Sequence, residues 1–344
     1  AQGGGKQKWA LIKSTKGVPY KLSATATPAP NDYIEFASQA SFLERMRHEN
    51  EVIWTYFQRN PKTNEWTVKR HAREAFFEWM SSWSIYVRDP RRYGWRKGHK
   101  DIPPPQIIEH ELDPTAEQIE EVQQLCQLKD GQMSLFDISG IGIVQRSKLS
   151  QVAKGFRYLT KGRDSREGKK RKKYHRIHST KPNFVAELAR KENGDGLKVL
   201  VWTVFDAESD LICEELNRQQ VDHRKLTGST PDHERLSILE DFRHGKIDTL
   251  VSRPAMLGYG QNFQVVGSMI FSGFNDSYVS WYQAIRRAYR YGQTRSVRVH
   301  VPLIHLLEGD MLDNLRSKEA KHEAAIAEME KNYIRAMQKL KGAA

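Results

Sequence analysis

Residues 197–216 have the sequence "LKVLVWTVFDAESDLICEEL", and this stretch decides the fold class. Its first part, residues 197–205, is a continuous apolar run rich in valine, which predicts a strand buried on both faces. A helix is predicted directly after it, at 207–219. A buried strand that leads at once into a helix is typical of a parallel sheet, because parallel strands need such crossover connections.

The same alternation of strand and helix patterns continues on both sides of this stretch. The other predicted helices lie at 181–191, 231–244 and 278–291, and the other predicted strands at 222–228, 247–252, 268–273 and 296–304. Continuous apolar runs between helices indicate parallel strands with helices on both faces. We therefore expect a doubly wound α/β domain of about 125 residues, with a parallel sheet flanked by helices.

The chain before this domain is predicted to be rich in helices. Helical patterns lie at 33–48 and 71–87, and the second predicts a packing face because its large apolar side chains recur at near-helical spacing. That face consists of Phe76, Phe77, Met80, Trp83 and Ile85. Between 18 and 32 we expect a short strand that breaks into a turn, since Pro28 and Pro30 exclude a helix there.

Three further segments surround the α/β domain. Pro103 to Pro105 open a connector, and a capped amphipathic helix is predicted to start near Pro114. The run "KGRDSREGKKRKKYHR" at 161–176 is typical of a solvated linker, and it can also add affinity for DNA. After the domain, 311–340 predict one long charged helix.

Composition favours an intracellular protein with a polyanionic partner. The 344 residues carry a net charge of +13, which raises both the encounter rate and the affinity for phosphate backbones. The two cysteines, Cys126 and Cys213, fit neither a disulfide framework nor a zinc site, and we predict no metal site in this chain. No apolar run approaches the roughly 20 residues that span a bilayer, so we expect a soluble, cytoplasmic protein without membrane contact.

The segment "QAIRRAYRYGQ" at 283–293 contains three arginines. On the helix predicted there, Gln283, Arg287 and Arg290 stand at i, i+4 and i+7 and share one face, while Arg286 points elsewhere. Guanidinium groups at fixed spacing suit phosphoryl transfer, because they stabilise charge on the γ-phosphate. From spacing alone, a surface cluster that pairs with carboxylates is an equally open interpretation.

Other polar residues follow predicted strands, where ligands bind in open α/β sheets. Ser252 and Arg253 end one strand, while Thr227, Gly228 and Ser229 leave another. Contacts from such groups to a nucleic-acid backbone would be independent of sequence, because phosphates position a protein and bases specify its site.

The arginine segment resembles motif six of the Swi/Snf-related DNA translocases of helicase superfamily two. Five of its residues match the motif: Gln283, Arg287, Arg290, Gly292 and Gln293. Further stretches resemble other motifs of this family in the correct order. "LSATATPAPND" (22–32) resembles motif three, "LKVLVWTVFDAESDLICEEL" motif four, "LTGSTPDHERLSILEDFRHG" (226–245) the next block, and "LVSRPAMLGYGQNFQVVGSMIFSGFND" (250–276) motif five. The amino-acid sequences of motifs five and six resemble those of phage or bacterial members of the family.

The resemblance implies a RecA-like second lobe and assigns roles to particular residues. Arg287 and Arg290 would act on the γ-phosphate as arginine fingers. The nucleotide would be bound by Gln283 and by the turn of motif five, which contains Gly258, Gly260 and Asn262. Glycines suit such a turn because they let backbone N–H groups approach a phosphate. The residues that would contact DNA, which the resemblance implies is double-stranded, are Thr227, Gly228, Ser229, Ser252 and Arg253. The residues that would couple the two lobes are Ser23, Ala24 and Thr25. ATP with Mg²⁺ would be bound mainly by the first lobe.

That first lobe should carry a phosphate loop and an acidic magnesium motif, and neither occurs in this sequence. "GGGKQ" near the start differs from a phosphate loop, because Gln7 follows Lys6 where Ser or Thr is required. We therefore expect a truncated chain with little ATPase activity of its own. Its expected parts are a first-lobe remainder (1–102) with a helical insertion (33–98), a linker (103–179), the second lobe (180–306) and a C-terminal helix (307–344). A non-hydrolysing DNA-binding module and a protein-interaction scaffold stay open as alternatives.

Overall fold

The protein is described by a computed structural model that divides into two compact units. Unit 1 comprises residues 1–99 and 316–344, and unit 2 comprises residues 100–315. The structure describes residues 6–25, 33–61, 66–85, 87, 91, 102–126, 143–159, 173–257, 261–274 and 277–342. The division into first-lobe remainder, linker, second lobe and C-terminal helix stays a prediction.

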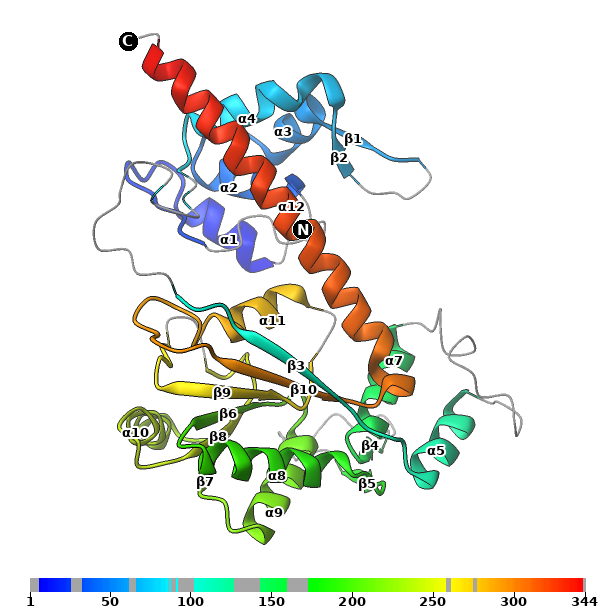
Figure 1. Cartoon of the computed structure of the whole chain (residues 1–344). Coiled ribbons are helices and arrows are strands. Elements are labelled where there is room, and N and C mark those ends of the chain that lie inside the picture. Colours follow the sequence, from blue (N-terminus) through cyan, green and yellow to red (C-terminus); the bar gives the residue numbers. More distant parts are fainter. Residues whose placement is uncertain are drawn as a thin grey trace. The chain divides into compact units, whose positions relative to one another are not determined.

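Unit 2 is built on a six-stranded sheet in which every pairing is parallel (Figure 1). The strand order is β3-β10-β9-β6-β8-β7. The strands are β3 (Gln106–Glu111), β6 (Lys198–Trp202), β7 (His223–Leu226), β8 (Thr249–Ser252), β9 (Val266–Phe271) and β10 (Arg298–Leu303). From central β6 the chain first builds β7 and β8 on one side and then β9 and β10 on the other. The direction of winding therefore reverses at β6, which creates a crevice at the carboxyl ends of the strands.

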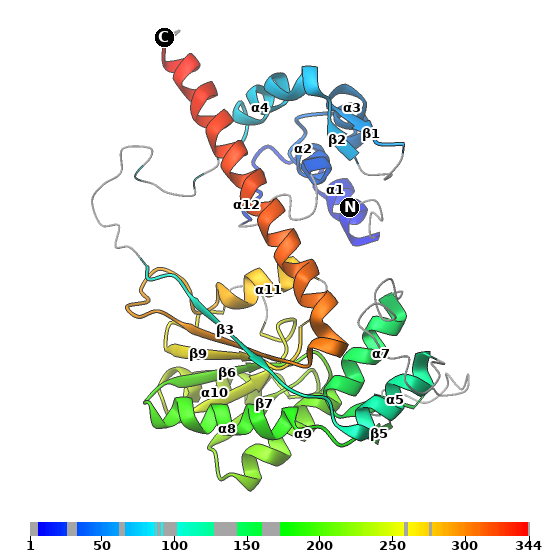
Figure 2. The same cartoon turned by 45° about the vertical axis from the view of Figure 1, so that its right-hand side comes forward.

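Helices cover both faces of this sheet, and the alternation along β6 explains why. Val199 and Val201 pack into a core with α8 (Lys181–Gly194) and α9 (Asp206–Arg218). Leu200 and Trp202 point to the other core, which contains apolar residues of α10 (Asp232–Arg243) and α11 (Tyr278–Ile285). Figure 2 shows α8 and α11 on opposite sides of the sheet. The predicted α/β class with a parallel sheet is confirmed.

Smaller elements complete unit 2. Two helices, α5 (Ala116–Cys126) and α7 (Ile143–Ala153), contribute to a third core with the start of α12 (His305–Gly342). An antiparallel pair, β4 (Phe156–Tyr158) and β5 (Tyr174–Arg176), follows α7. Most of the basic run predicted at 161–176 lies outside the described residues.

Unit 1 has an aromatic core around Phe76. This residue is fully buried, and the centroids of several other aromatic rings lie within 6.4 Å of its ring centroid. Its elements are α1 (Lys6–Ser14), η1 (Tyr33–Glu35), α2 (Phe36–Phe42), α3 (Glu49–Tyr56), β1 (Phe57–Arg59), β2 (Trp66–Val68), η2 (Arg70–Ala72) and α4 (Arg73–Ser81). The later part of α12 belongs to this unit: Met329 joins the aromatic core, and Lys339 binds Glu74 and Glu78.

The predicted packing face of 71–87 is confirmed for Phe76, Phe77 and Met80, which are buried. The helix is shorter than predicted, however, because α4 ends at Ser81. Ile85 therefore lies beyond the helix and is 83% exposed. The predicted helix at 33–48 is also interrupted, since α2 ends at Phe42 and Glu44 has a positive φ of 54°. Within the described residues, no helix is both long and apolar enough to cross a membrane.

Candidate nucleotide and nucleic-acid interface

The arginine segment differs from the predicted helix at 278–291. Regular helix α11 ends at Ile285, after which the Arg287 N–H donates to Ala284 O (3.2 Å), three residues back. The carbonyl of Arg287 accepts from the N–H of Phe263 (2.9 Å), so it serves a neighbouring segment rather than the helix ladder. Gly292 then turns the chain with a φ of +94°, which favours glycine. The i, i+4, i+7 argument was therefore wrong for Arg287 and Arg290, which lie in turns.

The turns nevertheless bring both arginines to Gln261 and Asn262, in the middle of the stretch 250–276 that resembles motif five. The Arg290 guanidinium donates to Asn262 Oδ1, and Arg287 Nη1 donates to the carbonyl of Gln261 (3.5 Å). Three of the residues predicted for the nucleotide site thus lie together. Gln283 is half-buried on α11. Gly258 and Gly260 lie outside the described residues.

Two neighbouring side chains show how this segment is held. Gln293 is buried, and its Nε2 donates to the carbonyls of Gln264 (3.1 Å) and Val266 (3.2 Å) at the start of β9. Arg286 is exposed and stacks over the rings of Tyr282 (4.9 Å) and Tyr289 (4.6 Å). Arg286 therefore occupies a different environment from Arg287 and Arg290, in agreement with the prediction that it points away from them.

The residues predicted to contact DNA lie at the carboxyl ends of β7 and β8. Thr227, Gly228 and Ser229 form a turn in which Thr227 Oγ1 and Ser229 Oγ are 3.0 Å apart. A Cβ added to Gly228 would lie 3.8 Å from Arg253 Nη2, so this turn and Arg253 are neighbours. Arg253 is 28% exposed and pairs with Asp206 at 3.2 Å. These four residues form what we call the strand-end cluster.

Ser252 stands apart from this cluster. It is buried, and its hydroxyl donates to the carbonyl of Leu226 (3.0 Å) on the neighbouring strand. Its side chain therefore links β7 and β8 inside the sheet.

A pocket of about 250 Å³ opens beside the strand-end cluster, at the ends of β6, β8 and β9. Its wall is largely apolar, with Met256, Phe274 and Trp281 among its lining residues. Arg253 contributes a charged group to the same pocket. No local sequence pattern indicates this pocket, because its wall comes from four separate segments.

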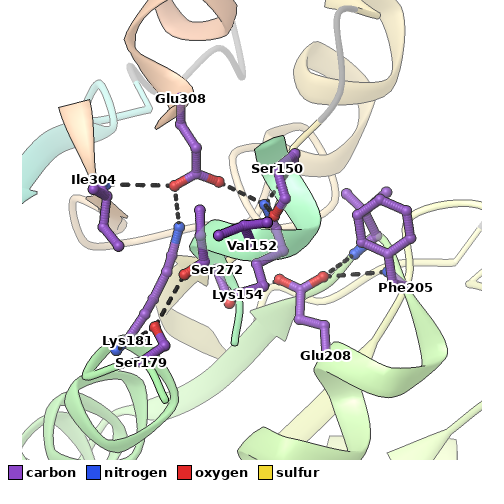
Figure 3. A network of polar contacts seen from close by, with 12 residues as sticks. Ser150, Val152, Lys154, Ser179, Lys181, Phe205, Glu208, Ser272, Ile304 and Glu308 are labelled. Carbon is purple, nitrogen blue, oxygen red and sulfur yellow. Dashed lines mark hydrogen bonds and ion pairs between the residues drawn. The ribbon is translucent and has the colours of Figure 1, made fainter. Parts of the chain in front are cut away.

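A buried ionic network lies behind these strand ends, as Figure 3 shows. Glu308, at the start of α12, accepts from Lys154 Nζ (2.5 Å) through one oxygen and from Lys181 Nζ (2.6 Å) through the other. All three side chains are only 1% exposed. Nearby, Glu208 accepts from the Val204 N–H (2.8 Å) and from Ser272 Oγ (2.8 Å). The network ties α7, α8, α9, β9 and α12 together.

Burial and the neighbouring charges shift the pKa of two side chains in this network, Lys181 and Glu308. Burial lowers the pKa of Lys181, although Glu308 opposes that shift. Burial alone would raise the pKa of Glu308, but the ammonium groups of Lys154 and Lys181 outweigh it and hold the pKa below its usual value. No spacing rule could have found this network, since its members are separated by up to 154 residues.

The remaining predicted sites lie elsewhere. Ser23, Ala24 and Thr25 are exposed and belong to unit 1. Across the described part of the chain, no group of three or more His, Cys, Asp and Glu side chains could hold a metal ion. The arginines and amides near Asn262 suit a phosphate rather than a cation.

Residues 180–292 match the model of the protein family "Helicase conserved C-terminal domain". They form the C-terminal lobe of a Swi/Snf-related helicase of superfamily two. This C-terminal lobe contains the parallel sheet, the strand-end cluster and the arginine segment up to Gly292. The predicted parallel sheet flanked by helices is confirmed.

Curated relatives of the lobe are much longer proteins. The "Chromatin-remodeling ATPase INO80" of Saccharomyces cerevisiae is 31% identical over 145 residues, which cover 41% of this chain and 10% of the relative. The mouse "DNA excision repair protein ERCC-6-like 2" is 30% identical over 146 residues, which cover 41% of this chain and 9% of the relative. The chain thus spans about a tenth of these relatives. A phage or bacterial origin stays a prediction.

Two solved structures are similar to parts of the chain. The C-terminal part of the Fun30 ATPase domain is 15% identical, with a TM-score of 0.48, and the match covers 62% of this chain and 89% of that one. The Sulfolobus solfataricus SWI2/SNF2 ATPase core in complex with dsDNA is 21% identical, with a TM-score of 0.42, and the match covers 66% of this chain and 48% of that one.

Proposed function

We propose that this helicase C-terminal lobe works in an ATP-dependent DNA translocase and supplies arginine fingers to a nucleotide held mainly by another lobe. The observation that carries the proposal is the joint placement of Arg287 and Arg290 against Gln261 and Asn262. Two guanidinium groups, one held on the Gln261 backbone carbonyl and the other on the Asn262 side chain, can stabilise the charge that develops on a transferred phosphoryl group.

The chemistry of the site fits this assignment. Asn262 is an uncharged acceptor, so its bond to Arg290 leaves the positive charge of the guanidinium uncompensated by that partner. Gln283 adds a half-buried amide on the preceding helix. ATP with Mg²⁺ would supply the phosphoanhydride bond to be hydrolysed. Arg287 and Arg290 would hold its terminal phosphate, and Gly258 and Gly260 stay candidates for the same site.

We assign the strand-end cluster to the DNA backbone. Thr227 and Ser229 offer hydroxyls, Gly228 offers a backbone approached without a side chain, and Arg253 offers a guanidinium that pairs well with phosphate. The net charge of +13 favours such a partner. Ser252 would support this edge through its bond to Leu226 rather than touch DNA. Ser23, Ala24 and Thr25 are proposed to couple lobe closure to this edge.

The proposal is tested in a longer protein that joins this chain to a lobe with a phosphate loop. Arg287→Ala and Arg290→Ala should each lower DNA-stimulated ATP hydrolysis by roughly 10³-fold or more, with DNA binding nearly intact. Arg286→Ala is the matched control, because it removes a guanidinium from the same segment that stacks on tyrosines instead. Equal turnover in Arg287→Ala and Arg286→Ala would refute the assignment.

A further inference from the structure

The pocket beside the strand-end cluster has the features of a ligand site. It lies at the carboxyl ends of β6, β8 and β9, where the winding of the sheet reverses and where open α/β sheets bind their ligands. Its volume of about 250 Å³ is below the roughly 300–1,000 Å³ typical of pockets for drug-sized molecules. A single planar heterocycle is therefore a better match than a large ligand.

The walls of the pocket are held in place by the buried network behind them. Glu208 binds the N–H of Val204 and the hydroxyl of Ser272, which immediately precedes the pocket residue Gly273. A Cβ added at Gly273 would lie 2.6 Å from Glu208 Oε1, so the backbone packs closely against this carboxylate. The pocket is thus largely formed before any ligand arrives, which lowers the cost of binding.

The lining favours a flat, largely apolar ring. Trp281 and Phe274 contribute aromatic surface with ring centroids 6.1 Å apart, and Met256 adds a polarisable side chain. Thr203 also lines the pocket, but its hydroxyl already bonds to Ser209 Oγ at 2.7 Å. Apolar and aromatic walls of this kind accept every base, because each base has a π-face.

The surroundings of the pocket favour a nucleic acid over a protein side chain as the source of that ring. Arg253 belongs both to the pocket and to the strand-end cluster. A Cβ on Gly228 would lie 3.5 Å from Met256 Sδ, so the proposed phosphate contacts adjoin the pocket wall. A nucleotide carries its phosphate and its base within this short reach.

We infer that the pocket accepts one unpaired nucleobase of the strand whose phosphates contact the strand-end cluster. This inference rests on the proposed function, because it uses the same DNA. An unpaired base is the favoured ligand, since the cost of extrusion is least for a base that is not paired. The lobe would then bind DNA with a displaced base more tightly than a perfect duplex, without preference for sequence.

The test uses this 344-residue chain and three duplexes of equal length. One duplex is fully paired, one has a single unpaired adenine, and one has an unpaired abasic site with the same backbone. Binding is measured by fluorescence anisotropy at low salt. We expect the adenine duplex to bind about 5- to 150-fold more tightly than the abasic duplex, the range for stacking one base.

A variant that fills the pocket makes the test specific. Ala255 lines the pocket and is exposed, so Ala255→Phe adds volume there without disturbing the core. It should make the adenine and abasic duplexes bind equally while affinity for the paired duplex is kept. Ser237→Phe, at an exposed position on α10 outside the pocket lining, is the control and should keep the preference for adenine.

The outcomes separate this inference from the proposed function. Equal affinity for all three duplexes overturns the inference alone, and is the result expected if the pocket holds a protein side chain. A preference for adenine that survives in Ala255→Phe also overturns it. Failure to bind any duplex at low salt overturns both this inference and the proposed DNA contacts.

Discussion

Replacing Glu308 with glutamine is the sharpest test of how the C-terminal lobe is held together. Glu308 is the shared counter-ion of two ammonium groups, those of Lys154 at 2.5 Å and Lys181 at 2.6 Å, and all three side chains are 1% exposed. Glu308→Gln keeps the size of the side chain but leaves Lys154 and Lys181 without their shared counter-charge. Breaking a buried ion pair by removing one partner costs about 3–5 kcal/mol. Against a typical domain stability of about 5–15 kcal/mol, such a loss would unfold a marginal lobe.

The assay must report unit 2 separately, because two units can unfold independently. Hydrogen exchange of peptides from β6 and β8 does so, since β8 is fully buried in unit 2 and β6 is buried except at Lys198. Glu214→Gln is the control: it breaks an ion pair with Arg176 whose side chains are 51% and 61% exposed, and should cost at most about 1 kcal/mol.

A second variant distinguishes an ionic role from simple loss of packing. Replacing Lys154 and Lys181 with methionine and Glu308 with leucine removes all three charges while keeping most of the volume. Such replacements of buried ion pairs are often neutral or stabilising. If Glu308→Gln lost no more stability than Glu214→Gln, the assignment of a stabilising buried network would be refuted.

Two further predictions concern DNA binding and pH. Arg253→Ala should weaken DNA binding and reduce the slope of log affinity against log salt concentration by about one. The control variant Arg224→Ala, near the amino end of β7, should leave that slope unchanged. Identical slopes in both variants would contradict a phosphate contact by Arg253. Burial lowers the pKa of His110 and His300, whose rings meet at 2.9 Å between β3 and β10. The unfolded chain therefore binds more protons than the native lobe below about pH 6.5, so urea unfolding should show stability falling as pH drops from 6.5. His110→Gln should flatten that dependence, and an unchanged profile would exclude this pair as its source.

The four inner strands of the sheet, β10, β9, β6 and β8, could be predicted from the sequence because they are short, largely apolar and buried runs, whereas edge strand β3 is mostly exposed and lacks such a run. Residues 197–205 contain β6, and 247–252 contain β8, each within a few residues of the observed bounds. The pattern also placed the strand-end cluster correctly, since the carboxyl ends of parallel strands share one edge.

Features that depend on contacts between distant segments could not be predicted. Helix α11 ends at Ile285, and the Arg287 carbonyl beyond it accepts from the Phe263 N–H, a contact that no local propensity encodes. The same limit applies to the pocket, and to Lys154 and Lys181, whose burial depends on a carboxylate from α12.

The most direct test of the central claim is the affinity of the two-lobe protein for ADP with aluminium fluoride, a mimic of the γ-phosphoryl group in transfer, compared with its affinity for ADP alone. Arginine fingers act on charge that develops in the transition state, so they should strengthen binding of the mimic selectively. We predict that Arg287→Ala weakens binding of the mimic by at least about 10²-fold and leaves ADP affinity and the Arg286→Ala control nearly unchanged. Equal losses for the mimic and for ADP, or no loss for either, would contradict the account.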